Sequence, residues 1–180
     1  MKLRSSSVCT ILFLTLLMAS CDNSDTSADP YDRDDDEPIF MALSRDSPKL
    51  AAAVAQAQKT LPDFIDAFSA GRHEEHGFLV KSLFIGEDDD DRAHIWTAVR
   101  TIHEGNLACY PIQIPTGFTG LKEDQLVLIP PDSVEDWMIN ADGEIYGAYS
   151  LRLQRELTPD SERASFDEHI GLKKFTDQKP

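Results

Sequence analysis

The sequence predicts an α+β fold in which a twisted antiparallel β-meander of five to six strands is covered by an N-terminal helix pair. Residues 78–153 hold short apolar runs with strand composition, separated by Gly, Pro and acidic turns. Residues 48–70 instead repeat apolar side chains at helical spacing. At 180 residues, the chain has the length of one domain with a substantial core.

The first twenty residues have the pattern of a signal peptide. Lys2 and Arg4 precede an apolar run over residues 8–18, which is too short for a stable membrane span of about 20 residues. The small residues Ala19 and Ser20 then precede Cys21, and this Leu-Met-Ala-Ser-Cys ending resembles a bacterial lipoprotein signal. We expect residues 1–20 to be removed and Cys21 to be lipidated. An ordinary signal peptide cut after Ser20 is the alternative.

Residues 21–44 are predicted to be a lipidated, disordered acidic tether. The segment is rich in Asp, Ser and Pro, and it has too few large apolar side chains to offset the entropy of ordering. The acidic run 34–37 lacks the alternating ligands and the Gly of a calcium loop, so no metal site is predicted. By resemblance to enteric lipoproteins, Asp22 indicates retention at the inner membrane. The expected location is the bacterial cell envelope, facing the periplasm.

The globular α+β domain is predicted over residues 45–155, and its helices come first. Ser47 is a suitable N-cap, and Pro48 fits the first position of a helix over residues 48–60. Pro62 should interrupt that helix, because a proline inside a helix removes a hydrogen bond. A second helical piece should therefore start at Pro62 and end near Gly71.

Six strands are expected to follow the helix pair. Their turns carry Gly, Pro, Asn or Asp, and Gly147 marks a bend or a close contact in the last strand. The expected strands are 78–85, 94–102, 107–114, 125–129, 134–139 and 144–153. Residues 156–180 contain only scattered apolar side chains, so we expect a peripheral C-terminal tail with a marginal helix.

The cysteine count excludes an internal disulfide in the mature chain. Cys9 lies in the signal, and Cys21 is the expected lipid carrier, which leaves Cys109. Because no basic cluster surrounds Cys109 in the sequence, we interpret it as a small buried hydrophobic residue rather than a reactive thiol.

Six residues form a candidate site for a polar ligand. They are charged or aromatic side chains in otherwise apolar strands, namely Lys81, His94, Trp96, Asp136, Trp137 and Arg152. A competing interpretation places the tryptophans in the core and assigns Asp136 to backbone amides. No nucleophile elbow, phosphate loop or complete metal motif occurs, so neither a catalytic residue nor a cofactor is predicted. The run His73 to His76 lacks the further ligands that a metal needs.

The net charge of -15 argues against nucleic acid as a partner, because phosphates would be repelled. The leading hypothesis is a non-catalytic envelope lipoprotein that binds a ligand or a protein and is held at the membrane by its lipid. An acidic inhibitor or immunity-type protein that meets a basic partner is the first alternative. A hydrolase that uses His94 or Asp136 is the second.

Five phrases in order resemble one family. They are Gln58 to Phe64, Gly77 to Lys81, His94 to Trp96, Val134 to Met138, and Gly147 to Arg152. Together they are similar to domain-of-unknown-function family 2314, which includes YegJ-type bacterial lipoproteins, over about residues 45–155. The run Leu107 to Pro111 departs from the family, because Ala108 and Cys109 stand where a Gly and an Asn tend to occur. The resemblance implies an α+β fold and an envelope location, but no reaction.

Overall fold

The computed structural model describes residues 47–88 and 91–177. All of them belong to the second of two units, Asp36–Pro180. The expected signal peptide, Cys21 and the tether 21–44 lie outside the described residues. Within the described part of the chain, three α-helices, two 3-10 turns and seven strands follow in the order α1 (Pro48–Ser69), η1 (Arg72–Glu74), β1 (Gly77–Ile85), β2 (Arg92–His103), β3 (Asn106–Pro111), β4 (Val127–Ile129), η2 (Pro131–Ser133), β5 (Val134–Ala141), β6 (Glu144–Gly147), α2 (Tyr149–Leu157), α3 (Arg163–His169) and β7 (Lys174–Thr176).

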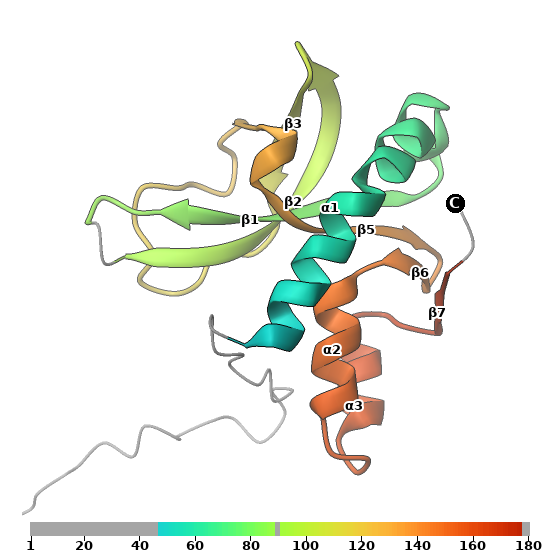
Figure 1. Ribbon diagram of the computed structural model, residues 1–180. Coiled ribbons are helices and arrows are strands. Elements are labelled where there is room, and N and C mark those ends of the chain that lie inside the picture. The colour runs from blue at the N-terminus through green and yellow to red at the C-terminus, as the bar shows by residue number, and fades with distance from the viewer. Residues whose placement is uncertain (1–46, 89–90, 178–180) are drawn as a thin grey trace, which may run out of the picture. The chain divides into compact units, whose positions relative to one another are not determined.

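The predicted α+β class is confirmed, but the sheet is not a simple meander. Its strands lie in the order β4-β3-β2-β1-β5-β6-β7, so β5 pairs with the free edge of β1 instead of with β4. Neighbouring strands are antiparallel except β6 and β7, which are parallel. The described sheet thus has one strand more than the predicted maximum, and β1 is central (Figure 1).

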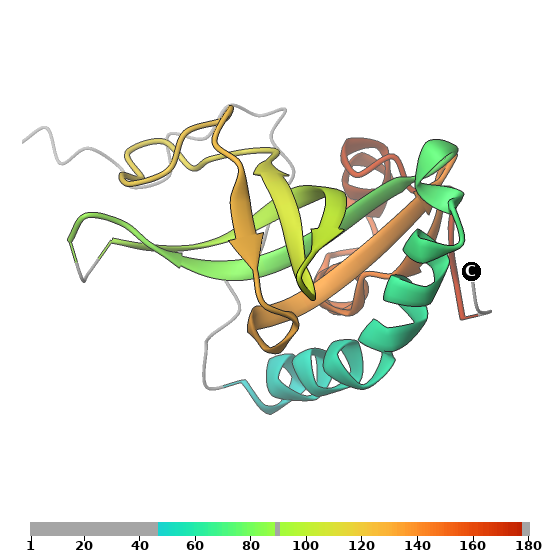
Figure 2. The ribbon, with the colours of Figure 1, turned by 90° about the horizontal axis from the view of Figure 1, so that it is seen from above.

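The connection from β4 to β5 shows that this sheet must curl. In a flat sheet these two strands would lie about 19 Å apart, which is four steps of about 4.8 Å. Residues 130–133 connect them, a length that spans at most about 18 Å when fully extended. Part of that connection is η2, a 3-10 turn that rises only about 2 Å per residue. Figure 2 shows the strands crossing one another at steep angles, as a strongly twisted sheet requires.

The predicted helix pair is wrong, because α1 continues through Pro62 as one helix of 22 residues. A proline inside a helix costs about 3 kcal/mol. Leu61, Phe64 and Phe68 flank it and are all buried, and each contributes roughly 1.5–3 kcal/mol by leaving water. Burial of this face therefore outweighs the broken hydrogen bond, and α1 bends along its length (Figure 2).

The last predicted strand, 144–153, is also wrong beyond Gly147. The chain turns there through two residues with positive φ, Gly147 at 68° and Ala148 at 53°. Helix α2 then begins at Tyr149. An alternating Tyr149, Leu151, Leu153 pattern resembled a strand, but the positive φ values end the extended conformation first.

The predicted C-terminal tail 156–180 contributes more than peripheral structure. Strand β7 does lie at an edge of the sheet, where it pairs with β6. Helix α3, however, inserts Phe166 into the core, where its side chain is 1% exposed. Arg155 of α2 donates to both carboxylate oxygens of Asp167, at 2.6 and 2.8 Å, which fixes α3 against α2.

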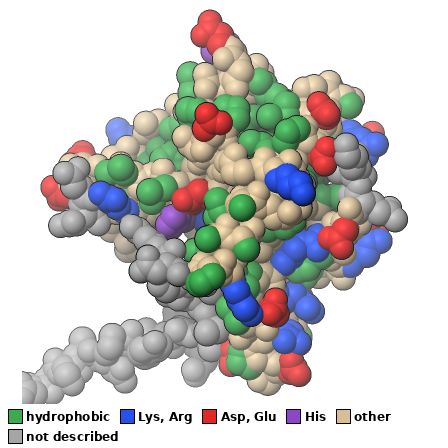
Figure 3. All heavy atoms as spheres, in the orientation of Figure 1, with side chains coloured by type: hydrophobic (Ala, Val, Ile, Leu, Met, Phe, Trp, Pro, Cys, Tyr) green, Lys and Arg blue, Asp and Glu red, His purple; other side chains and the backbone are tan. Residues whose placement is uncertain are grey.

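The two faces of the sheet carry separate hydrophobic clusters. On one face, α1 packs Phe64 against Phe78 and Trp137, with ring centroids 5.1 and 5.5 Å apart. On the other face, α2 and α3 pack against Met138 and Ile145. Figure 3 shows positive and negative side chains intermixed over the lower part of the molecule, where α2 and α3 lie. Leu79 of β1 and Trp96 of β2 pack against this second cluster but are only partly buried, which leaves room for a pocket on this face.

Candidate functional site

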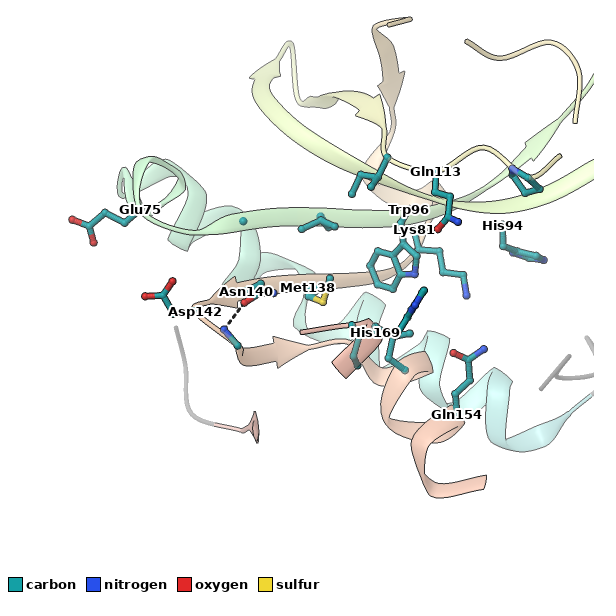
Figure 4. Close-up of a pocket in the computed structure, with 17 residues that line it drawn as sticks. Glu75, Lys81, His94, Trp96, Gln113, Met138, Asn140, Asp142, Gln154 and His169 are labelled. Atoms are coloured by element: carbon teal, nitrogen blue, oxygen red, sulfur yellow. Dashed lines mark hydrogen bonds between the residues drawn. The ribbon is translucent and has the colours of Figure 1, made fainter. Parts of the chain in front are cut away.

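A pocket of about 1040 Å³ opens on the face that α2 and α3 cover incompletely. Strand register brings its central residues together, because Lys81 on β1 pairs with Trp96 on β2. Paired residues of neighbouring strands project from the same face. Three of the six residues predicted as a polar ligand site, Lys81, His94 and Trp96, line this pocket (Figure 4).

Lys81 contributes a half-buried positive charge to the pocket wall. Its Nζ lies 6.0 Å from the centroid of the Trp96 ring, and no ion pair or hydrogen bond of this amine occurs among the described residues. Burial lowers the pKa of Lys81, while the charges of Asp136 and Glu135 raise it less strongly. A Lys in this state is a ready donor for an incoming anion or carbonyl group.

His94 is held by a residue that the sequence analysis did not include in the site. Its Nδ1 donates to Oε2 of Glu135 at 2.5 Å, and both side chains are about one-third exposed. The pairing of β1 with β5 shifts between Lys81 and Ser82, which leaves Glu135 as the extra residue of a β-bulge. A bulge re-aims a side chain, so Glu135 reaches the pocket face beside His94.

Asp136 stabilises the fold instead of facing the pocket. It is 1% exposed, and its carboxylate accepts hydrogen bonds from the backbone N–H groups of Trp137, Tyr149 and Ser150 at 2.8, 3.1 and 2.7 Å. The last two are the first N–H groups of α2, which need an acceptor. Burial raises the pKa of this carboxyl, and those donors oppose the shift. Asp136 therefore accepts hydrogen bonds from backbone amides, as the competing interpretation of the sequence expects.

Trp137 lies on the opposite face of the sheet from Lys81. It is 3% exposed, and its Nε1 donates to the carbonyl of Ala57 at 3.1 Å, inside α1. The core interpretation of this tryptophan is therefore the observed one.

Arg152 lies on helix α2, not on a strand, and does not join Lys81. Its guanidinium donates to the carbonyls of Gly147 and Thr176, both at 2.7 Å, and pairs with Asp177. It also lies 4.7 Å from the Phe175 ring centroid, so it ties α2 to β7.

The pocket also contains polar residues that sequence reasoning missed. Gln113, Asn140 and Gln154 come from the chain after β3, from β5 and from α2, and Glu75 and Asp142 lie at one end. No motif joins them, because their distances along the chain carry no periodic signal. Gln154 reaches the pocket from the unpredicted helix α2, and the pairing of β1 with β5 places Asn140 there.

Two further groups of residues lie outside the pocket. Cys109 is buried, which confirms its predicted position in the core, and burial raises the pKa of its thiol to about 11. His73 stacks on Phe68 at 4.3 Å and contacts its carbonyl. In residues 47–88 and 91–177, no group of three or more His, Cys, Asp and Glu side chains is placed to hold a metal ion. No helix in these ranges is long and apolar enough to cross a membrane.

The fold and the pocket define an α+β domain with a curled sheet, in which α1 covers one face and a pocket lies on the other. Residues 47–174 match the family described as uncharacterized proteins conserved in bacteria, domain-of-unknown-function family 2314, and the chain belongs to that family. The predicted resemblance to family 2314 is thereby confirmed, and the match extends beyond the expected residues 45–155 to residue 174.

One curated relative is a putative ankyrin repeat protein of Neisseria meningitidis serogroup B. It is 28% identical over 98 residues, which cover 52% of this chain and 38% of the relative. The chain thus spans well under half the length of this relative. No solved structure matches the chain.

Proposed function

We propose that the protein is a non-catalytic binding module of the bacterial cell envelope that holds a ligand in the pocket beside Trp96. The observation that carries this proposal is the Lys81 amine, which lines the pocket without an ion pair in the described part of the chain. Burial disfavours the charged amine, and the charges of Asp136 and Glu135 offset that penalty only in part. A bound anionic or hydrogen-bonding ligand would supply the remaining compensation.

The composition of the pocket supports binding over chemistry. Among the described residues that line it, none is a Ser, Thr or Cys that could serve as a nucleophile. Asp136, the carboxylate of the alternative hydrolase hypothesis, already accepts N–H groups through both oxygens. The pocket volume of about 1040 Å³ lies just above the usual range for small-molecule sites, about 300–1,000 Å³.

The location is a second part of the proposal. The apolar run 8–18 followed by Ala19, Ser20 and Cys21 supports a lipid anchor at the membrane surface. A tether from that anchor would raise the local concentration of the pocket at the membrane. Two results are expected. Globomycin should block processing of the chain, and Cys21→Ser should abolish its association with the membrane. A soluble, unlipidated mature form would overturn the location.

Binding to the pocket can be tested with 8-anilinonaphthalene-1-sulfonate, an aromatic anion that combines the two features that Trp96 and Lys81 recognise. The full-length chain carrying Cys21→Ser is titrated, and the dye fluorescence is followed. We expect saturable binding of one dye per chain, with energy transfer from tryptophan that decreases in Trp96→Phe.

A matched pair of variants locates the dye. Leu79→Trp fills the pocket from its floor, whereas Leu128→Trp adds the same bulk at an exposed position that does not line the pocket. The first variant should weaken binding at least tenfold, and the second should leave it unchanged. Equal binding by both variants, or no saturation in the parent chain, would overturn the proposed function.

A further inference from the structure

The two ends of the pocket are lined by different charged side chains. Glu75 and Asp142 line one end (Figure 4). At the other end His94 is paired with Glu135, so Lys81 is the cation there that a ligand could meet. Strand pairing separates these ends, because Gly77 pairs with Asn140 at one end and Lys81 with Asp136 at the other. Neither Glu75 nor Asp142 forms an ion pair within the described ranges. A ligand with a cationic end and an anionic end would match this arrangement.

The separation of the two ends limits the length of such a ligand. Four residues of strand separate Gly77 from Lys81, which corresponds to about 13 Å at about 3.3 Å per residue. Glu75 lies two residues before Gly77, outside β1 and with helical backbone angles, so its distance from Lys81 is less than the roughly 20 Å of six extended residues. Two charge-assisted contacts of about 2.8 Å then leave roughly 7 Å to less than about 14 Å for the ligand. Two to four residues of extended peptide cover that distance, at about 3.4 Å per residue.

The middle of the pocket is suited to a peptide chain. Leu79, Met138 and Trp96 form an apolar floor, and Gln113 and Gln154 add side-chain amides. A primary amide donates and accepts, as the N–H and C=O groups of a peptide require. Asn140 accepts a hydrogen bond from Gly143 N at 2.7 Å, which leaves its NH₂ group available to donate.

We infer that the pocket binds a short peptide of two to four mainly apolar residues in extended form, with a free N-terminus at Glu75 and Asp142 and a free C-terminus at Lys81. This inference rests on the proposed function, because it names the ligand class of the same pocket. It adds recognition of both charged ends, which neither a neutral ligand nor a simple aromatic anion would require.

Calorimetry with the peptide Ala-Leu-Leu-Ala tests the inference on the full-length Cys21→Ser chain. The free peptide is compared with its N-acetylated form and its C-terminal amide. Each modification removes one charge and leaves the apolar middle unchanged. We expect the amide to bind about tenfold more weakly, because it loses a charge-assisted contact with the half-buried Lys81. The acetylated peptide should bind only about threefold more weakly, since Glu75 and Asp142 are exposed and contacts with exposed charges are weak.

Variants at the two ends of the pocket show which end causes each loss of peptide affinity. In Lys81→Met, the free acid and the amide should bind equally. In the double variant Glu75→Gln and Asp142→Asn, the free and acetylated peptides should bind equally. Lys59→Met and Glu123→Gln remove exposed charges that do not line the pocket and should preserve both differences.

The results separate this inference from the proposed function. Equal binding of all three peptides, or differences that persist in Lys81→Met and the double variant, would overturn end recognition. Saturable dye binding without peptide binding would overturn the peptide inference and leave the proposed pocket function standing. Failure of both dye and peptides would overturn both.

Discussion

The two tryptophans of this chain show how differently the two faces of one sheet are used. Trp137 on β5 points toward α1, is 3% exposed and donates its indole N–H to Ala57. Trp96 on β2 points to the other face, is only partly buried and lines the pocket beside Lys81. The same residue type thus completes a closed core on one face and an open wall on the other.

The difference arises from what covers each face. Helix α1 is 22 residues long and buries five side chains on its face of the sheet. The other face is covered by the shorter helices α2 and α3, which pack near β5 and β6. Stability is therefore expected to depend mainly on the α1 face, whereas ligand recognition is expected to depend on the uncovered part of the other face.

The largest expected effect compares the tryptophans directly. Trp137→Ala should lower the free energy of unfolding by about 3–5 kcal/mol, because it leaves a cavity among packed rings. Trp96→Ala should cost only about 1–2 kcal/mol, since its ring is partly in water already. Urea unfolding of both variants measures the difference. Equal losses would show that the two faces do not divide these roles.

A close contact between Gly147 and Trp137 gives the second prediction. A Cβ at Gly147 would lie 2.5 Å from the carbonyl oxygen of Trp137 and 2.6 Å from its ring, at a φ of +68°. Gly147→Ala should therefore cost about 2–4 kcal/mol from overpacking and an unfavourable φ.

The control for that prediction is Gly71→Ala. Gly71 also has a positive φ, +86°, but nothing lies within 4 Å of the added Cβ. Only the conformational cost of about 1 kcal/mol should remain. A thermal denaturation series in which both glycine variants lose the same stability would contradict the close contact.

Asp136→Asn tests the connection between β5 and α2. The amide can still accept N–H groups through its oxygen, but its NH₂ group would face a backbone N–H that now donates to the carboxylate, such as that of Ser150. An unsatisfied buried N–H costs about 1–3 kcal/mol. Circular dichroism during urea unfolding measures the loss, and the exposed Asp132→Asn should be close to neutral. A fully stable Asp136→Asn variant would argue against the capping role.

The smallest expected effect concerns Lys81 on the open face. Because burial lowers the pKa of Lys81, folding disfavours its charged form. The unfolded chain then binds more protons between the lowered pKa and 10.5, so this group makes stability rise with pH in that window. Lys81→Met should remove that rise.

The measurement is the stability difference between Lys81→Met and the parent chain at pH 7 and at pH 10. Other titrating groups are common to both proteins, so the difference isolates Lys81. Lys81→Met should be the more stable at pH 7, and its advantage should shrink at pH 10. A difference that is independent of pH would indicate that Lys81 is not desolvated by the fold.

Much of the fold could be predicted from local residue patterns. Phe78 and Val80 alternate with Leu79 and Lys81, and the observed β1 has those two faces. Asn140 to Gly143 predicted a hairpin turn, and β5 and β6 pair across it. The errors at Pro62 and after Gly147 have one physical origin. At both places local preference indicated one conformation, but contacts with distant residues stabilised another.

The pocket could be predicted only in part for the same reason. Lys81, His94 and Trp96 were identified because charged or polar-edged residues are unusual in apolar strands. Glu135 was missed as the partner of His94, since an alternating strand would place it on the face opposite Asp136. The β-bulge that brings it to the pocket results from the pairing of β1 with β5.

The sequence by itself determined the α+β class, the start of α1, the approximate positions of five strands with the start of a sixth, and the two chemical faces of β1, because these depend on neighbours a few residues apart. Tertiary structure decided the strand order, the continuity of α1 through Pro62 and the helix that Asp136 caps. It also decided which polar side chains meet across the pocket. Those features depend on which distant segments become neighbours, and the burial and hydrogen bonding gained there exceed the local preferences that oppose them.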